Sequence, residues 1–154
     1  MKHLKPGVLC LFAFSICAMV SAQKIPLPGQ STVSKSRIFN NIPDRMPVVA
    51  SRLMPLLALR KGQETSIPFS DQFTFRGTVV ASVSKYNDAI QSTVIRSADY
   101  PDVSLTVSKV KKSDGSIVYR GRIVSFKHGD CFELKNENGQ YILVKRNFED
   151  MVND

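Results

Sequence analysis

The stretch that decides the fold is FTFRGTVVASVS at residues 73–84. Apolar side chains largely alternate there with polar ones, which is the period-two pattern of a strand that buries one face. Residues 103–108, VSLTVS, show the same alternation without interruption. Gly77 lies in the middle of the first stretch and predicts a bulge or a bend in that strand. Both stretches therefore predict β structure.

Turn-forming residues separate the stretches on either side of this pattern. They are Asn87-Asp88, Tyr100-Pro101-Asp102, Asp114-Gly115, His128-Gly129-Asp130 and Asn136 to Gly139. Short turns join neighbouring antiparallel strands, so we expect a meander. Residues 62–154 are thus predicted to form an all-β domain of six to seven antiparallel strands, as a small barrel or a two-layer sandwich. A short helical turn is expected after Asn147.

The composition is that of one globular domain. The chain has 154 residues, of which 43% are hydrophobic and 22% charged. These values exclude a collagen-like chain, a coiled coil, extended disorder and a membrane protein of several spans. The chain is long enough to bury a core without disulfides or a metal.

Residues 1–22 have the parts of a secretory signal peptide. Lys2 and Lys5 precede an apolar run over 8–20, and small residues at 20–22 form a cleavage site. The run is too short for a membrane-spanning helix, which takes roughly 20 residues. We expect export to the periplasm or the extracellular space, the alternative being an uncleaved N-terminal anchor. Lipidation at Cys17 is not expected, because a bulky isoleucine precedes it.

The surplus positive charge lies between the expected signal peptide and the domain. Residues 23–61 carry seven basic side chains and one acid, Asp44, whereas residues 62–154 are neutral overall. Residues 23–43 predict a flexible linker, since proline, glycine, serine and threonine are frequent in its first half. Residues 44–61 predict a basic helical arm that begins near Asp44 and that Pro55 either kinks or divides into two short pieces.

Two interpretations of the arm are open. In the first, its apolar residues pack on the domain and its arginines face water. These apolar residues are Val48, Val49, Leu53, Leu56, Leu57 and Leu59. In the second, the arm is an amphipathic element that binds an anionic lipid, an acidic polysaccharide or a partner protein.

The sequence His128-Gly129-Asp130-Cys131 contains the single histidine and the single cysteine that follow residue 22. A cysteine nucleophile needs a nearby base, but side chains in a tight turn usually point apart. We therefore expect a hairpin turn followed by a structural Cys131, on the strand face opposite to Phe132, with a half-covered and inert thiol. The alternative is an exposed thiol that forms an intermolecular disulfide. Lys127 and His128 are expected to lower the pKa of the Cys131 thiol. One histidine and one cysteine are too few for a zinc site, and no cofactor is expected.

Binding is therefore expected in place of catalysis. The candidate binding residues are Arg45, Arg52, Arg60 and Lys61 in the arm and Arg76, Arg96, Arg120 and Arg122 in the strands. Together with Lys109, the strand residues would form a basic stripe for carboxylate or sulfate groups if neighbouring strands align them. The alternative is a solvated sheet face that keeps the strands soluble.

The function predicted from the sequence is that of an exported, non-enzymatic binding or accessory module for a protein or an envelope polymer. The alternative is attachment to an anionic membrane or envelope surface through residues 44–61. A cysteine-dependent hydrolase that uses Cys131 is a third hypothesis. Nucleic acid is not expected as a partner, because no binding motif for it is present.

Overall fold

A computed structural model describes residues 37–147 of the chain. The expected signal peptide, residues 23–36 of the expected linker and the expected helical turn at 148–154 lie outside the described residues. Within 37–147 the chain forms eight strands and one helix. In chain order they are β1 (Arg45–Val48), α1 (Ala50–Leu57), β2 (Glu64–Ser70), β3 (Phe73–Lys85), β4 (Ile90–Ser97), β5 (Val103–Lys111), β6 (Ile117–Ser125), β7 (Asp130–Glu137) and β8 (Gln140–Asn147).

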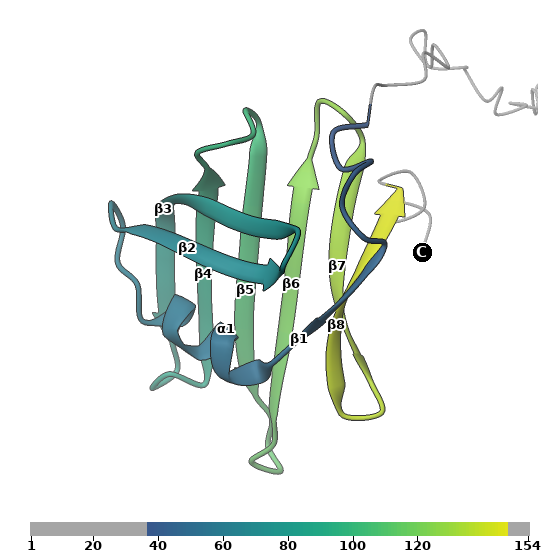
Figure 1. Cartoon of the computed structure of the whole chain (residues 1–154). Helices are drawn as coiled ribbons and strands as arrows, with labels where there is room; N and C mark the ends of the chain where they lie inside the picture. Colours follow the sequence, from purple (N-terminus) through teal and green to yellow (C-terminus); the bar gives the residue numbers. More distant parts are fainter. Residues whose placement is uncertain (1–36, 148–154) are drawn as a thin grey trace, which may run out of the picture. The chain divides into compact units, whose positions relative to one another are not determined.

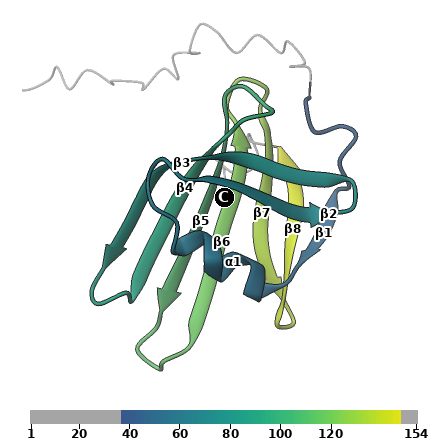
Figure 2. The same ribbon diagram turned by 60° about the vertical axis from the view of Figure 1, so that its left-hand side comes forward.

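All eight strands belong to one antiparallel sheet in the order β1-β8-β7-β6-β5-β4-β3-β2. The two end strands, β1 and β2, contact each other, so the sheet nearly closes into a barrel (Figure 1). Helix α1 lies between β1 and β2 and faces β4 to β6 in both views (Figures 1 and 2). The predicted all-β antiparallel fold is confirmed, with a barrel-like sheet of eight strands where six to seven were expected.

The alternation in the sequence decides which side chains fill the barrel. In β5, Val103, Leu105 and Val107 are each 1% exposed, while the polar residues between them face outward. A cluster of aromatic rings fills one part of the core around Phe39, which lies 5.4 Å from Phe132 between ring centroids. Its other members are Phe69, Phe73 and Tyr100.

The sheet curves strongly along β3. Its register against β4 shifts between Val79 and Ala81, which marks a bulge three residues beyond the position that the sequence suggested. Gly77 serves a different purpose, because a Cβ atom there would lie 2.1 Å from the carbonyl oxygen of Arg96. The two backbones can approach this closely only where the side chain is absent.

Residues 37–43 belong to the folded domain, although the sequence predicted a flexible linker up to residue 43. Phe39 is 1% exposed and Ile42 is 6% exposed. The buried carboxylate of Asp130 holds this segment, since its Oδ2 accepts hydrogen bonds from the backbone N–H of Ile38 (2.6 Å) and of Phe39 (3.3 Å). The sequence did not indicate this folded segment, because large apolar residues are few in it. Two buried apolar side chains are enough to hold the segment when a buried acceptor also binds its backbone.

Residues 44–61 form a strand and then a helix, where the sequence predicted a helical arm that is kinked or divided into two short pieces. Met46 and Val48 in β1 point into the core, and Pro47 is tolerated because β1 is an end strand of the sheet. Pro55 lies inside α1, where proline costs about 3 kcal/mol. Burial of three leucines at about 2 kcal/mol each outweighs that cost. These are Leu53, Leu56 and Leu57.

The first interpretation of residues 44–61, in which the apolar residues pack on the domain, therefore holds for most of these residues. Val48 and the three leucines of α1 are buried, and Leu59 is half-buried. Val49 is the exception, because 60% of its surface is exposed.

Candidate functional site

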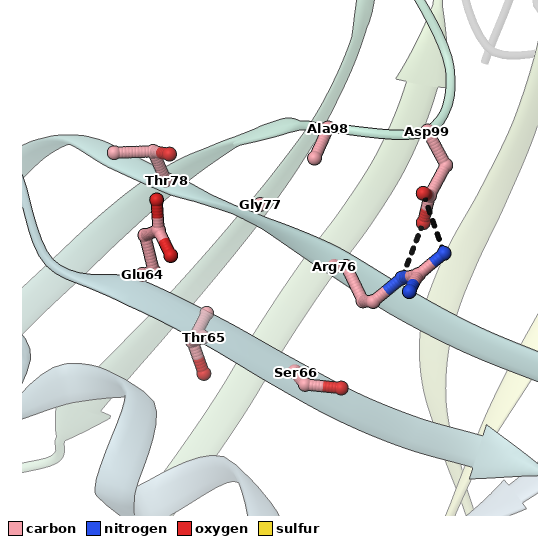
Figure 3. A pocket seen from close by; sticks show the side chains of 8 residues that line it. All are labelled: Glu64, Thr65, Ser66, Arg76, Gly77, Thr78, Ala98 and Asp99. Atoms are coloured by element: carbon pink, nitrogen blue, oxygen red, sulfur yellow. Dashed lines mark hydrogen bonds and ion pairs between the residues drawn. The ribbon is translucent and has the colours of Figure 1, made fainter.

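Two open depressions lie on the outer surface of the barrel. The first spans about 520 Å³ over β2, β3 and the turn between β4 and β5. The second spans about 630 Å³ over β4, β5 and the turn between β6 and β7. Glu64, Thr65, Ser66, Arg76, Gly77, Thr78, Ala98 and Asp99 line the first (Figure 3). Arg96, Asp102, Val103, Ser104, Phe126 and Lys127 line the second.

The first depression is polar and its charged groups are held in place. Arg76 donates two hydrogen bonds to the Asp99 carboxylate, from Nε to Oδ2 (3.1 Å) and from Nη2 to Oδ1 (2.8 Å). This pairing raises the pKa of Arg76, so the guanidinium stays charged. Ser97 Oγ accepts hydrogen bonds from the backbone N–H of Asp99 and of Tyr100, which fixes the turn that carries the carboxylate. On the other side, Glu64 points toward Thr78 (Figure 3).

The second depression combines two cations with an aromatic ring. Arg96 points outward from β4 and forms no ion pair with any residue in 37–147, whereas Arg76 does. Lys127 lies in the turn after β6, beside Phe126, of which 64% is exposed. Ser104 adds a hydroxyl group and Asp102 a carboxylate. An exposed ring next to cations suits a ligand with an apolar face and an acidic group.

The strand register joins the two depressions. Glu64 pairs with Thr78, Thr78 with Arg96, and Arg96 with Ser104. These four residues form one row across β2, β3, β4 and β5, which we call the polar row. Neighbouring strands lie about 4.8 Å apart, so the polar row is roughly 15 Å long. It offers a carboxylate, two hydroxyl groups and a guanidinium in a continuous line on the outer surface.

The predicted strand residues do not form a basic stripe. Arg76 and Arg96 lie at the two depressions, whereas Arg120 and Arg122 both lie on β6. Arg122 lies 4.0 Å from the Glu133 carboxylate. Lys109 is on the opposite face, because it pairs with the inward-facing Tyr119. Side chains alternate between the two faces of the sheet, and the bulge in β3 shifts the register. These two effects separate residues that the sequence suggested would align.

The predicted arm residues are spread over three elements. Arg45 in β1 pairs with Glu137 at 2.6 Å. Arg52 in α1 donates a hydrogen bond to the carbonyl oxygen of Pro68 at 2.7 Å. Arg60 and Lys61 are exposed in the turn that follows α1. The structure therefore uses two of these four side chains to bind the arm to the rest of the sheet.

The turn that contains His128 is a structural feature. Asp130 is 2% exposed, and its carboxylate accepts the two backbone hydrogen bonds from 38–39 and lies 3.9 Å from the Arg37 guanidinium. A carboxylate with these partners holds the chain and is not available to orient a catalytic base.

Cys131 is fully buried. Its thiol lies on the strand face opposite to Phe132, as the sequence predicted, and donates a hydrogen bond to the carbonyl oxygen of Arg146 at 3.3 Å. Burial raises the pKa of this thiol to about 11, with a smaller contribution from the Glu133 carboxylate. The expectation that Lys127 and His128 would lower this pKa is wrong, because removal of the thiolate from water dominates and the cations that oppose it are Arg122 and Arg146.

We predict that Cys131 reacts slowly with a thiol reagent in the folded protein. At pH 8 a pKa of about 11 in place of an ordinary one near 9 leaves about 100-fold less thiolate. Labelling by iodoacetamide should therefore be at least 100-fold slower than in denaturant, and should rise about tenfold per pH unit up to about pH 11. Cys131→Ser identifies the relevant signal as the labelling that it removes. Fast labelling at pH 8 without denaturant would show that the thiol is accessible.

Several residues of the two depressions had no signal in the sequence. Glu64, Asp99 and Ser104 come from separate strands and turns, and only the register places them beside the predicted arginines. Phe126 had a partial signal, since it is a large aromatic residue directly before a turn. Sequence spacing could not show that its ring is exposed.

Two further kinds of site concern the same residues, a metal site and a membrane-spanning helix. Between residues 37 and 147, no group of three or more His, Cys, Asp or Glu side chains is arranged to hold a metal ion. In that range no helix has the length and apolar character needed to cross a membrane. Neither a model of a protein family, nor a curated protein, nor a solved structure matches the chain.

Proposed function

We propose that the protein is an exported, non-enzymatic module that binds an acidic polysaccharide of the cell envelope along the polar row. The observation that carries this proposal is the register of Glu64, Thr78, Arg96 and Ser104, which connects the two depressions. Hydroxyl groups of a sugar chain can donate to Glu64 and exchange hydrogen bonds with the row's own hydroxyl groups.

The charges of the second depression decide which sugar chain fits. Arg96 and Lys127 supply two cations against the single carboxylate of Asp102. A charge-assisted hydrogen bond from a guanidinium favours a carboxylate or sulfate group on the ligand. The exposed ring of Phe126 can pack against the apolar face of a sugar ring, as aromatic side chains do with flat apolar surfaces. A polysaccharide with regularly spaced acidic groups has each of these features.

The shape of the site favours a polymer over a small molecule. A site for a small molecule encloses most of its ligand, commonly 70–90% of the ligand surface. The polar row is instead an open line roughly 15 Å long, which leaves most of a small ligand exposed. A chain that extends beyond both depressions can use the whole row, while a single sugar would contact only part of it.

We predict that Arg96→Gln weakens binding of polygalacturonate about tenfold at low salt. The variant removes the one cation of the polar row, and a hydrogen bond to a charged group contributes about 1.5–3 kcal/mol. Isothermal titration calorimetry measures the dissociation constant, with neutral dextran as the comparison polymer. Arg120→Gln is the matched control, since Arg120 is also exposed, on the outer face, without an ion pair to a described residue.

Equal losses in the two variants would contradict the proposed site and indicate binding by overall charge. Equal affinity of the unaltered protein for polygalacturonate and dextran would contradict the choice of an acidic polymer. Capture of a protein in place of either polymer would contradict the choice of a polysaccharide.

Attachment to an anionic surface through residues 44–61 has less support. An amphipathic helix binds a membrane by inserting its apolar face. The leucines that would form this face, Leu53, Leu56 and Leu57, pack inside the barrel. The cysteine-dependent hydrolase likewise has little support, because the thiol is buried with a raised pKa.

A further inference from the structure

Four large apolar side chains are exposed at the ends of two adjacent hairpins. Tyr86 is 76% exposed, Ile117 49%, Val83 48% and Ile90 39%. We call these four residues the hairpin-end patch. Scattered apolar residues are normal on a surface, but four at one end of a molecule mark a contact site.

The strand register places the patch residues at neighbouring hairpin ends, with Val83 and Ile90 on the outer face of the sheet and Ile117 on the same face as the buried Tyr119. Ile90 pairs with Lys85 on β3 and with Val110 on β5, and Ile117 begins β6 opposite Lys111. The β3–β4 and β5–β6 hairpins therefore end side by side. Both views show these two hairpin ends projecting beyond α1 at the same end of the barrel (Figures 1 and 2).

The turn at the end of the β3–β4 hairpin has a defined conformation. Tyr86, Asn87 and Asp88 all have positive φ, at 53°, 51° and 63°. The Asp88 carboxylate accepts hydrogen bonds from Ser84 and from Gln91, which close the turn. Three consecutive residues in this sparsely populated region carry a conformational cost. The turn holds the Tyr86 ring in water, where burial of the ring adds nothing to the stability of the fold.

Lysines surround the patch. The two hairpin ends carry Lys85, Lys109, Lys111 and Lys112 against two acids, Asp88 and Asp114. None of the four lysines forms an ion pair with a residue in the described part of the chain. The Asp114 carboxylate is occupied by a hydrogen bond from the backbone N–H of Ser116 at 2.8 Å. The hydrogen bond from Ser116 and, to a lesser extent, the charge of Lys112 lower the pKa of the Asp114 carboxyl group. Four lysines against two acids leave this end of the barrel with a net positive charge.

We propose that the hairpin-end patch binds the surface of an anionic lipid bilayer. Apolar side chains at a protein surface can enter the boundary between headgroups and acyl chains, roughly 5–10 Å deep. A tyrosine suits this boundary because its ring is apolar and its hydroxyl group is polar. Lys85 pairs with Ile90 and Lys111 with Ile117, so these lysines lie level with the apolar side chains and are attracted to the lipid phosphates within about a Debye length.

This binding mode is compatible with the polar row and does not depend on it. Ile90 and Arg96 are at opposite ends of β4, roughly 20 Å apart for six residues of extended strand. The turns that line the second depression would therefore point away from the bilayer. The hairpin ends would attach the protein to a membrane while the polar row faces the polymer.

Cosedimentation with vesicles tests the proposal. The full chain and its variants are incubated with vesicles of phosphatidylcholine with 30% phosphatidylglycerol, and with vesicles of phosphatidylcholine alone. The contribution of residues 1–36 is then the same in every sample. We expect preferential binding to the anionic vesicles that weakens as salt is raised, because surface charges are screened.

Two variants remove the two components of the patch. Tyr86→Ser with Ile90→Ser should reduce the partition constant at least tenfold, since both apolar side chains are lost from the contact. Lys111→Gln with Lys112→Gln should reduce it about 25-fold on anionic vesicles, at about fivefold for each lysine. Neither variant should move the thermal midpoint by more than a few degrees, because the altered side chains are exposed.

Phe126→Ser is the matched control. It removes another exposed aromatic side chain, at the opposite end of β6, and should leave vesicle binding unchanged. Unchanged binding in both patch variants would overturn the proposal. Loss of self-association in place of lipid binding, seen by sedimentation velocity, would also overturn it and assign the patch to a second copy of the chain. Polygalacturonate binding by the patch variants should be unaffected, which separates this outcome from that of the polar row.

Discussion

Gly77→Ala is expected to lower the free energy of unfolding by about 3 kcal/mol or more. The added Cβ atom would lie 2.1 Å from the carbonyl oxygen of Arg96 and 2.9 Å from its carbonyl carbon. Both atoms belong to the backbone of β4, so no side chain can move aside. The two strands must separate at the point where the sheet curves. Urea unfolding followed by circular dichroism measures the loss.

Gly121→Ala is the matched control for this substitution. Gly121 also lies inside a strand, but there the new Cβ atom would be 3.1 Å from the Thr106 carbonyl oxygen and 3.5 Å from Leu134. A displacement of a few tenths of an ångström relieves this contact, so we expect a loss of about 1 kcal/mol. Comparable losses in the two variants would show that β3 and β4 do not approach as closely as described.

Asp130→Ala is expected to destabilise the protein by about 3 kcal/mol. It removes the buried acceptor of the Ile38 and Phe39 backbone N–H groups, and a buried donor left without a partner costs about 1–3 kcal/mol. It also releases the segment that carries the Phe39 ring into the aromatic core. Hydrogen exchange should show that these two amides lose protection before the strands do.

Two variants separate this local role from a general effect of charge. Asp130→Asn retains an oxygen acceptor and should preserve part of the protection at both amides. Asp44→Ala removes an ion pair with Lys145 at 2.7 Å, but Asp44 is 82% exposed in its side chain. Such an exposed pair contributes little to stability, because water screens it. A greater loss from Asp44→Ala than from Asp130→Ala would contradict the anchoring role.

The candidate site could be predicted only in part. Arg76 and Arg96 were identified because outward-facing arginines alternate with buried residues along strands, a local property of the sequence. Their partners could not be identified in this way. Asp99 reaches Arg76 across 23 residues, and Ser104 reaches Arg96 through strand pairing. Register depends on turn lengths and on the bulge in β3, and a shift of one residue would turn every side chain to the other face.

The segment before the sheet shows how burial overrides local preference. Residues 44–61 contain apolar residues at helical spacings, which predicted a helix that is kinked or divided into two short pieces. Met46 and Val48 instead form β1, because pairing with β8 nearly closes the barrel and satisfies their backbone groups. Four residues are too few for a period of two to be distinguished from a period of 3.6.

The sequence by itself determined the all-β class, its antiparallel pairing and the buried face of the strands up to the bulge in β3. Beyond that bulge, Val83 was expected on the buried face with Phe73 but is 48% exposed. Alternation and turn chemistry act within a few residues, so they can be read along the chain. Only the tertiary structure decided that Phe39 and α1 fill the barrel, that Cys131 is buried, and that the polar row and the hairpin-end patch exist. These features depend on contacts between residues far apart in the chain, which closure of the barrel creates and no local pattern encodes.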